Sequence, residues 1–308
     1  MHSATPSGHP WHEGVVDRVG VVYHPRHPEA FALAQAIGAR LEELQVAHWT
    51  SSAFDDGPFT ALLPATDLII SVGGDGTILK TARSVLPTPI PILGVNYGKV
   101  GFMAELAPTE VLHELPLLLA GQGWLEERAM LAAWAETGET GGDAPRSPAR
   151  AAHALNDVVV ARAAVGRPIG VSVHLDGEII ATYRCDAVIV ATATGSTGYS
   201  LSAGGPILPP ESDAILLTPV SAHLSLSNAI VLPPTSTITL TVATEHVAAL
   251  SVDGQGDVTL SDGQQVVVRQ SPYRTRFLRH RPRSYFYRTL RYHLSPHADP
   301  LWSEGDLR

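Results

Sequence analysis

The sequence predicts an α/β N-terminal domain with a doubly wound parallel sheet and a mostly β C-terminal domain. Apolar strand-like runs alternate with helix-like segments up to about residue 122, and short strand-like segments with Asp-Gly turns recur after it. A chain of 308 residues that is 44% hydrophobic is long enough for two such domains. The expected divisions are a loose extension at 1–13, the α/β domain at 14–122, the β-rich domain at 123–284, and a C-terminal helix and tail at 285–308 that pack back on the fold.

The N-terminal domain is expected to begin with a strand and a long helix. Apolar residues from Phe31 to Leu41 recur at helical spacing and predict a helix over 28–43. Residues 68–72 form an apolar run with β-branched side chains, which is typical of a parallel strand covered on both faces. The other elements expected in this domain are strands at 15–23, 46–50 and 90–95 and a helix at 108–120.

The turn Gly-Gly-Asp-Gly-Thr at 73–77 joins a buried strand to a helix that is expected to begin at about Thr77. Gly73, Gly74 and Gly76 leave bare N–H groups at a helix start, where the partial positive charge favours phosphate. Asp75 would repel a bound polyphosphate unless it holds Mg²⁺ or accepts a proton from an attacking hydroxyl. The turn therefore indicates phosphoryl transfer; the alternative is that Asp75 only caps the helix.

This spacing differs from Gly-x-Gly-x-x-Gly and from a P-loop that ends in Lys-Ser/Thr. It resembles the phosphate-binding signature shared by NAD kinases, lipid kinases of the diacylglycerol and sphingosine type, and 6-phosphofructokinases. The turn alone does not choose among these families.

The second domain is expected to consist of strands joined by tight turns. Asp-Gly pairs at 176–177, 253–254 and 262–263 are typical of hairpin turns. Residues 138–150 are polar and rich in glycine and proline, and predict a mobile hairpin tip, whereas 284–294 predict an amphipathic helix. The expected strands are 130–136, 155–162, 169–175, 178–183, 187–192, 237–244 and 258–269.

A second polar stretch follows the strand that is expected to end at Thr192. Residues 192–202 carry several hydroxyl side chains and one tyrosine among small residues, a composition that suits adenine edges and ribose hydroxyls. The alternative is a solvated connection, although apolar segments flank the stretch on both sides. Asn156 and Asp157, at the start of another strand, are able to clamp a ribose diol or simply to form a turn.

Composition excludes several classes of protein. Cys185 is the single cysteine, so no internal disulfide is possible and a reducing cytoplasm is the expected location. A net charge of −9 argues against non-specific nucleic-acid binding. The sequence contains no apolar run long enough to predict a membrane span, and residues 1–13 lack the apolar core of a signal peptide.

Taken together, the motifs resemble the NAD kinases of the bacterial ATP-NAD kinase family over roughly residues 18–294. The stretch at 195–206, Gly-Ser-Thr-Gly-Tyr-Ser-Leu-Ser-Ala-Gly-Gly-Pro, is nearly private to that family. The other supporting segments are GGDGT at 73–77, NYGKVGF at 96–102, ERAML at 127–131, LND at 155–157, TPVSAHLS at 218–225 and VDGQ at 252–255.

The resemblance implies transfer of the γ-phosphate of ATP, or of a polyphosphate, to the 2′-hydroxyl of the adenosine ribose of NAD. It implies that Asp75 is the proton acceptor, that a divalent cation such as Mg²⁺ assists, and that Gly73, Gly74, Gly76 and Thr77 hold the donor. The residues that it implies for NAD binding are Asp75, Gly76, Lys80, Phe102, Asn156, Asp157, Arg167, Arg184, Asp186, Thr194, Thr197, Gly198, Tyr199, Ser200, Leu201, Ser202, Ser221 and Gln255.

The resemblance further implies a homodimer or homotetramer, in which some sites are completed by a neighbouring subunit. Three departures from the family pattern are Ala193 in place of proline, Gly198 in place of alanine, and residues 227–229 in place of an Arg-Pro pair. Gly198 removes only a methyl group, so activity is expected to survive.

Two other functions compete with this hypothesis. A lipid kinase would share only the turn at 73–77, and the sequence shows no apolar or basic membrane face to support it. A non-catalytic NAD sensor would keep the NAD pocket, and replacement of Asp75 by Asn would distinguish it from a kinase.

Overall fold

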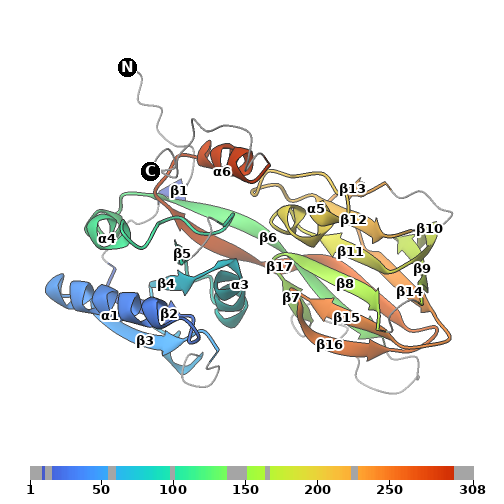
Figure 1. The fold of residues 1–308 in the computed structure, drawn as a ribbon, viewed down its shortest axis with the longest axis horizontal. Coiled ribbons are helices and arrows are strands. Elements are labelled where there is room, and N and C mark those ends of the chain that lie inside the picture. The colour runs from blue at the N-terminus through green and yellow to red at the C-terminus, as the bar shows by residue number, and fades with distance from the viewer. Residues whose placement is uncertain are drawn as a thin grey trace. The chain divides into compact units, whose positions relative to one another are not determined.

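The computed structural model describes residues 9–10, 16–54, 60–97, 101–136, 151–163, 167–222 and 228–294. The chain forms two compact units, shown as a ribbon in Figure 1. Unit 1 comprises Met1–Glu127 and Arg276–Arg308, and unit 2 comprises Arg128–Thr275. The expected boundary at 122/123 thus lies five residues before that of the structure, and the segment after Thr275, which was expected to remain β-domain up to residue 284, belongs to unit 1.

Unit 1 contains a parallel sheet in the order β17-β5-β4-β2-β3. Strand β4 is buried along its whole length because helices cover both faces of the sheet. The last residues of β17 complete the sheet, with Phe277 opposite Ile92. The strands are β2 (Arg18–Tyr23), β3 (Ala47–Ser52), β4 (Leu68–Gly73), β5 (Ile92–Asn96) and β17 (Gln265–Arg279), and β1 (His9–Pro10) pairs with β6 (Trp124–Glu136).

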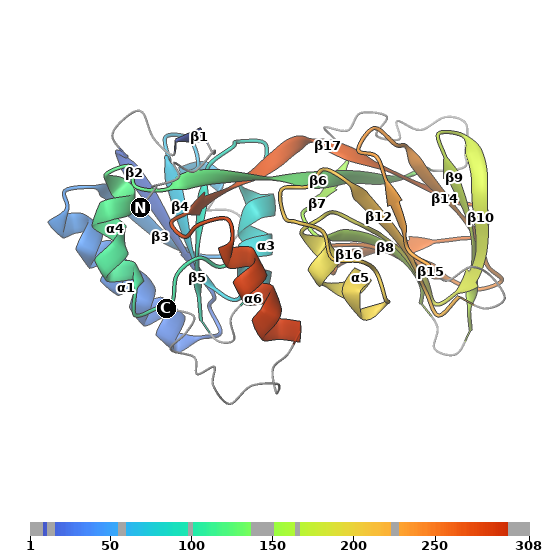
Figure 2. The same cartoon turned by 90° about the horizontal axis from the view of Figure 1, so that it is seen from above.

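Helices α1 (Pro28–Glu43) and α4 (Val111–Leu119) cover one face of this sheet and α3 (Asp75–Ser84) covers the other, as Figure 2 shows. On the first face, Ile37 and Leu115 join the alternate strand residues in one buried cluster. On the opposite face, the hydroxyls of Ser71 and Thr81 lie 3.1 Å apart. Helices on both faces of a parallel sheet confirm the doubly wound fold. Helix α6 (Tyr285–Leu294) ends the described chain.

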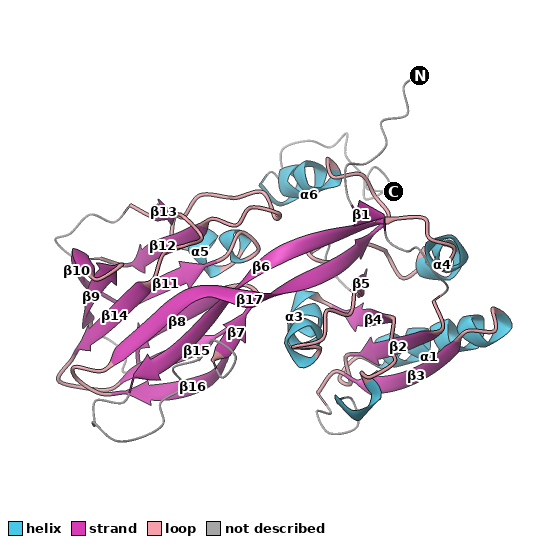
Figure 3. Cartoon of the chain, turned by 180° about the vertical axis from the view of Figure 1, so that it is seen from behind, coloured by secondary structure: helices cyan, strands magenta, loops and turns pink. Residues whose placement is uncertain are grey.

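Unit 2 is a β sandwich, whose strands are coloured magenta in Figure 3. Alternate residues of its two antiparallel sheets, such as Val160 of β8 and Val173 of β9, face a common core. One sheet has the order β13 (Ile230–Leu232), β12 (Ile215–Val220), β11 (Ala187–Ala191), β8 (Asp157–Arg162), β15 (Ala248–Val252), β16 (Gln255–Leu260). The other runs β10 (Glu178–Cys185), β9 (Ile169–Leu175), β14 (Ile238–Ala243), β17, and β7 (Ala152–Ala154) pairs with β6.

Several predicted elements begin or end elsewhere in the structure. Helix α3 begins at Asp75 instead of Thr77, because extended Gly74 is the N-cap and its carbonyl accepts the Thr77 N–H at 2.9 Å. The expected strand over 258–269 is two strands, β16 and β17, separated by the turn at 261–264. The polar stretch after Thr192 contains a short 3₁₀ helix at Gly195–Thr197 and α5 (Tyr199–Ser202). The expected hairpin tip at 138–150 lies outside the described residues.

Candidate functional site

The carboxylate of Asp75 is held by the backbone of a segment 27 residues further along the chain. Its Oδ2 accepts the N–H of Phe102 at 3.0 Å, and its Oδ1 accepts the N–H of Met103 at 3.4 Å. Gly101 has no room for a side chain, since an added Cβ would overlap the Asp75 carboxylate. Two amide donors therefore fix the carboxylate and leave lone pairs available for a further donor.

The turn at 73–77 keeps unpaired polar groups at the start of α3. The Oγ1 of Thr77 is buried and has no hydrogen-bond partner among the described residues. No atom lies within 4 Å of the position that a Cβ would take on Gly74 or Gly76. Space and unpaired donors at a helix N-terminus are the features of a phosphate site. Lys80 lies one turn further along α3 and is partly buried.

Phe102, which the resemblance assigns to NAD, packs against the C-terminal helix α6. Its ring centroid lies 4.6 Å from that of His293 and 6.2 Å from that of Phe286. The ring remains partly exposed. One surface of Phe102 is therefore committed to α6, and the exposed part is available to a ligand.

A buried ion cluster supports the segment that holds Asp75. Arg279, at the end of β17, donates to the Met103 carbonyl at 2.9 Å and pairs with Glu105 at 3.2 Å and Glu126 at 3.1 Å. Glu105 also accepts the N–H groups of residues 280 and 281. The charge of Glu126 and then that of Glu105 raise the pKa of Arg279 against the effect of its burial, so the guanidinium stays charged. A single cation thus joins the Met103 carbonyl and Glu105 to Glu126 and to the end of β17.

In unit 2, three neighbouring strand ends bring Asn156, Asp157, Asp253 and the stretch after Ala191 together. Ala191 lies opposite Asp157 in the β11–β8 pair, and Val252 lies opposite Val158 in the β15–β8 pair. The carboxylate of Asp253 accepts the N–H groups of residues 155, 156 and 157 at 2.9, 2.8 and 3.1 Å. Because the backbone at 155–157 is fixed in this way, the Asn156 and Asp157 side chains start from defined positions.

Asp157 is a buried carboxyl, only 7% exposed. Burial, and secondly the charge of Asp253, raise the pKa of Asp157 to about 7. The carbonyl oxygen Oδ1 of Asn156 is also buried, and it has no hydrogen-bond partner among the described residues. The Asp157 carboxyl, which titrates near neutral pH, is thus adjacent in sequence to an unpaired amide oxygen. A ligand hydroxyl would give each of these two groups a hydrogen-bond partner.

The stretch 192–202 contributes one more unpaired group and several structural ones. Thr194 is 6% exposed and its Oγ1 has no partner among the described residues. Ser200 is fully buried, and its hydroxyl lies 2.9 Å from that of Thr218. The remaining predicted binders differ in exposure: Tyr199 and Ser202 are exposed, and Thr197, Gly198 and Leu201 are partly buried.

Glycines let this stretch approach the backbone of Asn156. A Cβ on Gly195 would overlap the Asn156 carbonyl, whereas Gly198 would meet ordinary contacts at 3.4 and 4.0 Å. The alanine usual in the family at position 198 would therefore fit, and the glycine here leaves slightly more room. Ala193, another of the three departures, is buried, and its carbonyl accepts the Ser196 hydroxyl at 2.6 Å.

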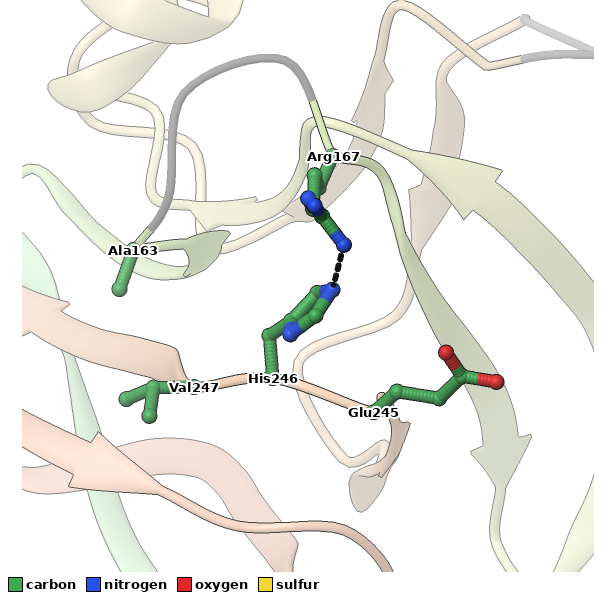
Figure 4. Close-up of a pocket in the computed structure, with 5 residues that line it drawn as sticks. All are labelled: Ala163, Arg167, Glu245, His246 and Val247. Atoms are coloured by element: carbon green, nitrogen blue, oxygen red, sulfur yellow. Dashed lines mark hydrogen bonds between the residues drawn. The ribbon is translucent and has the colours of Figure 1, made fainter.

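Four of the predicted residues lie near the opposite end of β8 and β11, two of them on or beside strands of the other sheet. Asp186 precedes β11 and pairs with Arg162 at 2.6 Å, Arg184 is exposed on β10, and exposed Ser221 follows β12 with a φ of 51°. Arg167 lies at 2.7 Å from His246 beside an open cavity of about 650 Å³, which Figure 4 shows with its lining residues. Gln255, by contrast, begins β16 opposite Val252, at the Asp157 end.

Sequence reasoning did not find three groups that position the site. Asp253 was assigned to a hairpin turn, which it does form, but its carboxylate also binds three amides about 97 residues away. Gly101 and Arg279 act through contacts of the same long-range kind. No residue type or spacing near these positions indicates such a role.

Neither a metal cluster nor a membrane-spanning helix is found in the described part of the chain. Among these residues, no three His, Cys, Asp or Glu side chains gather closely enough to hold a metal ion. In the same part of the chain, no helix is long and apolar enough to cross a membrane.

Two family models match most of the chain. The model of the ATP-NAD kinase N-terminal domain matches residues 32–122, and that of the C-terminal domain matches residues 155–280. A relative named NAD kinase from Dehalococcoides mccartyi (strain CBDB1) is 45% identical over 273 residues, which cover 89% of this chain and 94% of the relative. An NAD kinase from Chloroflexus aurantiacus (strain ATCC 29366 / DSM 635 / J-10-fl) is 39% identical over 280 residues, 90% of this chain and 98% of the relative.

Solved structures show the same fold. An NAD kinase from Archaeoglobus fulgidus in complex with ATP has a TM-score of 0.72 at 28% identity. The match covers 89% of this chain and 96% of the Archaeoglobus chain. Yeast NADH kinase complexed with NADH has a TM-score of 0.77 at 23% identity, and the match covers 95% of this chain and 91% of the yeast chain.

Proposed function

This chain belongs to the ATP-NAD kinase family, and from that premise we propose that unit 1 provides the phosphoryl-donor site and the catalytic base, while unit 2 holds NAD. The reaction is transfer of the γ-phosphate of ATP to the 2′-hydroxyl of the adenosine ribose of NAD, which gives NADP. The observation that carries the assignment is the Asp75 carboxylate, fixed by two amides at a helix start that has unpaired donors.

Asp75 is the proton acceptor in this proposal. A ribose hydroxyl is a weak nucleophile at neutral pH, so most of the acceleration comes from holding it beside a base and in line with the phosphate. The amides of residues 102 and 103 orient the carboxylate, whose remaining lone pairs accept the hydroxyl proton. The N–H groups at the start of α3 and the Thr77 hydroxyl stabilise the charge on the phosphate.

The donor is ATP, since the Archaeoglobus fulgidus NAD kinase was solved in complex with ATP. No cluster of acidic side chains or histidines on the described residues holds a metal ion by itself. A Mg²⁺ that accompanies ATP would therefore take most of its ligands from phosphate oxygens and water, and it would neutralise charge on the transferred phosphate.

NAD binds in unit 2 at the end of the sheet where Asn156 and Asp157 lie. The unpaired oxygens of Asn156 and Thr194 are the groups that a ribose and a base would satisfy. Tyr199 offers an exposed ring, and Gly198 keeps the approach open. Ser200 supports this site from behind, since its hydroxyl is already paired with Thr218.

Arg167, Arg184, Asp186 and Ser221 serve a second copy of the chain in this proposal. They lie at the opposite end of β8 and β11 from Asn156, a separation of about 16 Å for five strand residues. A homo-oligomer in which each subunit lends these residues to a neighbour would bring them to NAD. The single cysteine supports a cytoplasmic enzyme.

The Asp75→Asn variant tests the assignment and separates a kinase from an NAD sensor. The amide keeps the size of the side chain but cannot accept the proton, so turnover should fall by about 10²–10⁴-fold. The dissociation constant for NAD, measured by calorimetry, should stay within about twofold. Wild-type protein that makes no NADP from NAD with either ATP or polyphosphate would refute the proposed function.

A further inference from the structure

The parallel sheet of unit 1 changes direction between β2 and β4. The chain leaves β2, passes through α1 and adds β3 on one side, whereas β4 pairs with the other side of β2. Ligands of open α/β sheets bind outside the carboxyl ends of the strands at such a switch point. In this chain, the segments that leave those two strand ends are residues 24–27 and the turn at 73–77.

Residues 24–27 present a small basic cluster at this point. The N–H of His24 donates to the Val72 carbonyl at 3.1 Å, so the cluster starts beside the residue that precedes Gly73. The rings of His24 and His27 lie 4.6 Å apart. Arg26 is exposed, and no ion pair joins it to a carboxylate of the described residues.

The ring of His24 is set to act as a hydrogen-bond donor. Burial, followed by the charges of His27 and Arg26, lowers the pKa of His24, so the ring is neutral at pH 7. Its Nδ1 accepts the N–H of Arg26 at 3.2 Å, which leaves the proton of the neutral ring on Nε2. The ring of Phe54, 5.2 Å away, packs against it from the end of β3.

Two helices of 16 and 10 residues also begin at this edge. The N-cap residues of α1 and α3 are His27 and Gly74, and neither helix has a side-chain cap. In these first turns, Pro28 has no N–H, and the N–H groups of Ala30 and Thr77 donate to the N-cap carbonyls. The N–H groups of Glu29, Asp75 and Gly76 have no carbonyl partner among the described residues and are available to an anion. The buried, unpaired hydroxyl of Thr77 adds an independent sign of a missing partner on the α3 side.

We propose that residues 24–27 form the second wall of the phosphoryl-donor site, with Arg26, His24 and His27 binding the linked phosphates of the donor. The proposal rests on the proposed function, since it extends the donor site from the turn at 73–77. A chain with a net charge of −9 repels polyphosphate as a whole, so local cations are needed. Exposed Glu29 opposes them only weakly, because water and salt screen it.

The Arg26→Ala variant tests the proposal by steady-state kinetics with NAD and ATP. Loss of a charge-assisted bond to phosphate should raise the KM for ATP by about tenfold or more. The KM for NAD should stay within about twofold. Arg40→Ala is the matched control, because Arg40 belongs to the same unit but lies in the last turn of α1, at the helix end away from residues 24–27. Its guanidinium pairs only with exposed Glu43 among the described residues. An unchanged KM for ATP in Arg26→Ala would overturn the proposal.

Two further measurements keep this test independent of turnover and of folding. ATP binding measured by calorimetry should weaken about tenfold in Arg26→Ala and partly recover in Arg26→Lys, even if the wild type proved not to make NADP. Inorganic polyphosphate, used as the second donor or as a competitor of ATP, should lose affinity to the same degree. A loss confined to ATP would show contact with the nucleoside instead of the phosphates and would refute the proposed site.

Discussion

The buried carboxyl of Asp157 should make the stability of unit 2 depend on pH. Its pKa is raised from 3.8 to about 7, so between these values the folded state binds a proton that the unfolded state does not. Stability therefore falls as the pH rises from about 4 to 7, and the penalty is complete above 7. The Asp157→Asn variant lacks the penalty and should be more stable at pH 8 by on the order of 2–4 kcal/mol.

Thermal melts of wild type and Asp157→Asn at pH 5, 6.5 and 8 would check this. The difference in Tm should shrink toward pH 5, and NAD should bind the variant more weakly. The Asp253→Asn variant removes the neighbouring charge and should move the midpoint to lower pH. A Tm difference that does not vary with pH would contradict the assigned pKa.

Gly101 should be essential for catalysis but not for folding. A Cβ at this position overlaps the Asp75 carboxylate, so Gly101→Ala should displace that carboxylate and lower kcat by more than about tenfold. Because both changes act through the same group, Asp75→Asn combined with Gly101→Ala should be little worse than Asp75→Asn alone. Additive losses in kcat would show that Gly101 acts by another route.

At the scale of single residues, sequence reasoning reached the groups whose type and spacing have a chemical meaning. Asp75 in a glycine turn and Asn156 beside Asp157 were proposed from the motifs, and each now has a defined environment. Gly101 and Asp253 were not proposed, because their roles depend on contacts 27 and 97 residues away in the chain. Folding alone creates such contacts.

At the scale of elements, the junction of β17 with the segment after β5 depends on Arg279. Arg279→Met would leave Glu105 and Glu126 buried without their cation, which should cost roughly 3–5 kcal/mol in the free energy of unfolding. Replacing Glu126 by Met as well should recover part of this loss, since Glu105 keeps the two amides of residues 280 and 281.

Chemical denaturation of these variants measures the effect. Arg40→Ala, which breaks the exposed pair with Glu43, is the control and should cost less than about 1 kcal/mol. If the double variant were less stable than Arg279→Met alone, buried charge would not be the cause of the loss.

Elements with a clear period were predicted well and those without one were not. Helix α1 spans the predicted residues 28–43, because its apolar residues recur at the spacing of a helix and not at that of a strand. Strand β12 was missed, since Pro219 argues against a strand interior. The structure tolerates it because β13 pairs only with residues 215–217, so the proline lies where that side of β12 is unpaired.

At the scale of the whole molecule, exchange of subunits should restore activity between two inactive variants. Asn156→Ala removes a proposed NAD contact at one end of β8 and β11, and Arg184→Ala removes one on β10, near the opposite end of those strands. In a mixed oligomer, one interface can combine the intact Asn156 of one subunit with the intact Arg184 of its neighbour. Activity in the mixture should exceed that of both variants, as an assay of NADP formation would show.

Mass spectrometry of the mixture should first establish that subunits exchange. If mixed oligomers form and activity does not return, then both ends serve a single subunit, or Arg184 does not contact NAD. Either result would refute the shared arrangement.

The two-domain organisation was predictable because the α/β alternation and the later run of strands differ in kind. The assignment of residues 276–308 to unit 1 was not predictable from the sequence, because it depends on the pairing of the end of β17 with β5. A pattern of period two identifies a strand but not its neighbour.

The same return has a consequence for biosynthesis. Glu105 and Glu126 are synthesised long before Arg279. During translation, these two carboxylates therefore stay hydrated until the ribosome has added the arginine that pairs with them. The continuous stretch Arg128–Thr275 can close first, as contiguous domains do during synthesis. In a nascent chain stalled before residue 276, unit 2 should therefore resist protease, whereas the part of unit 1 already made should still be cleaved.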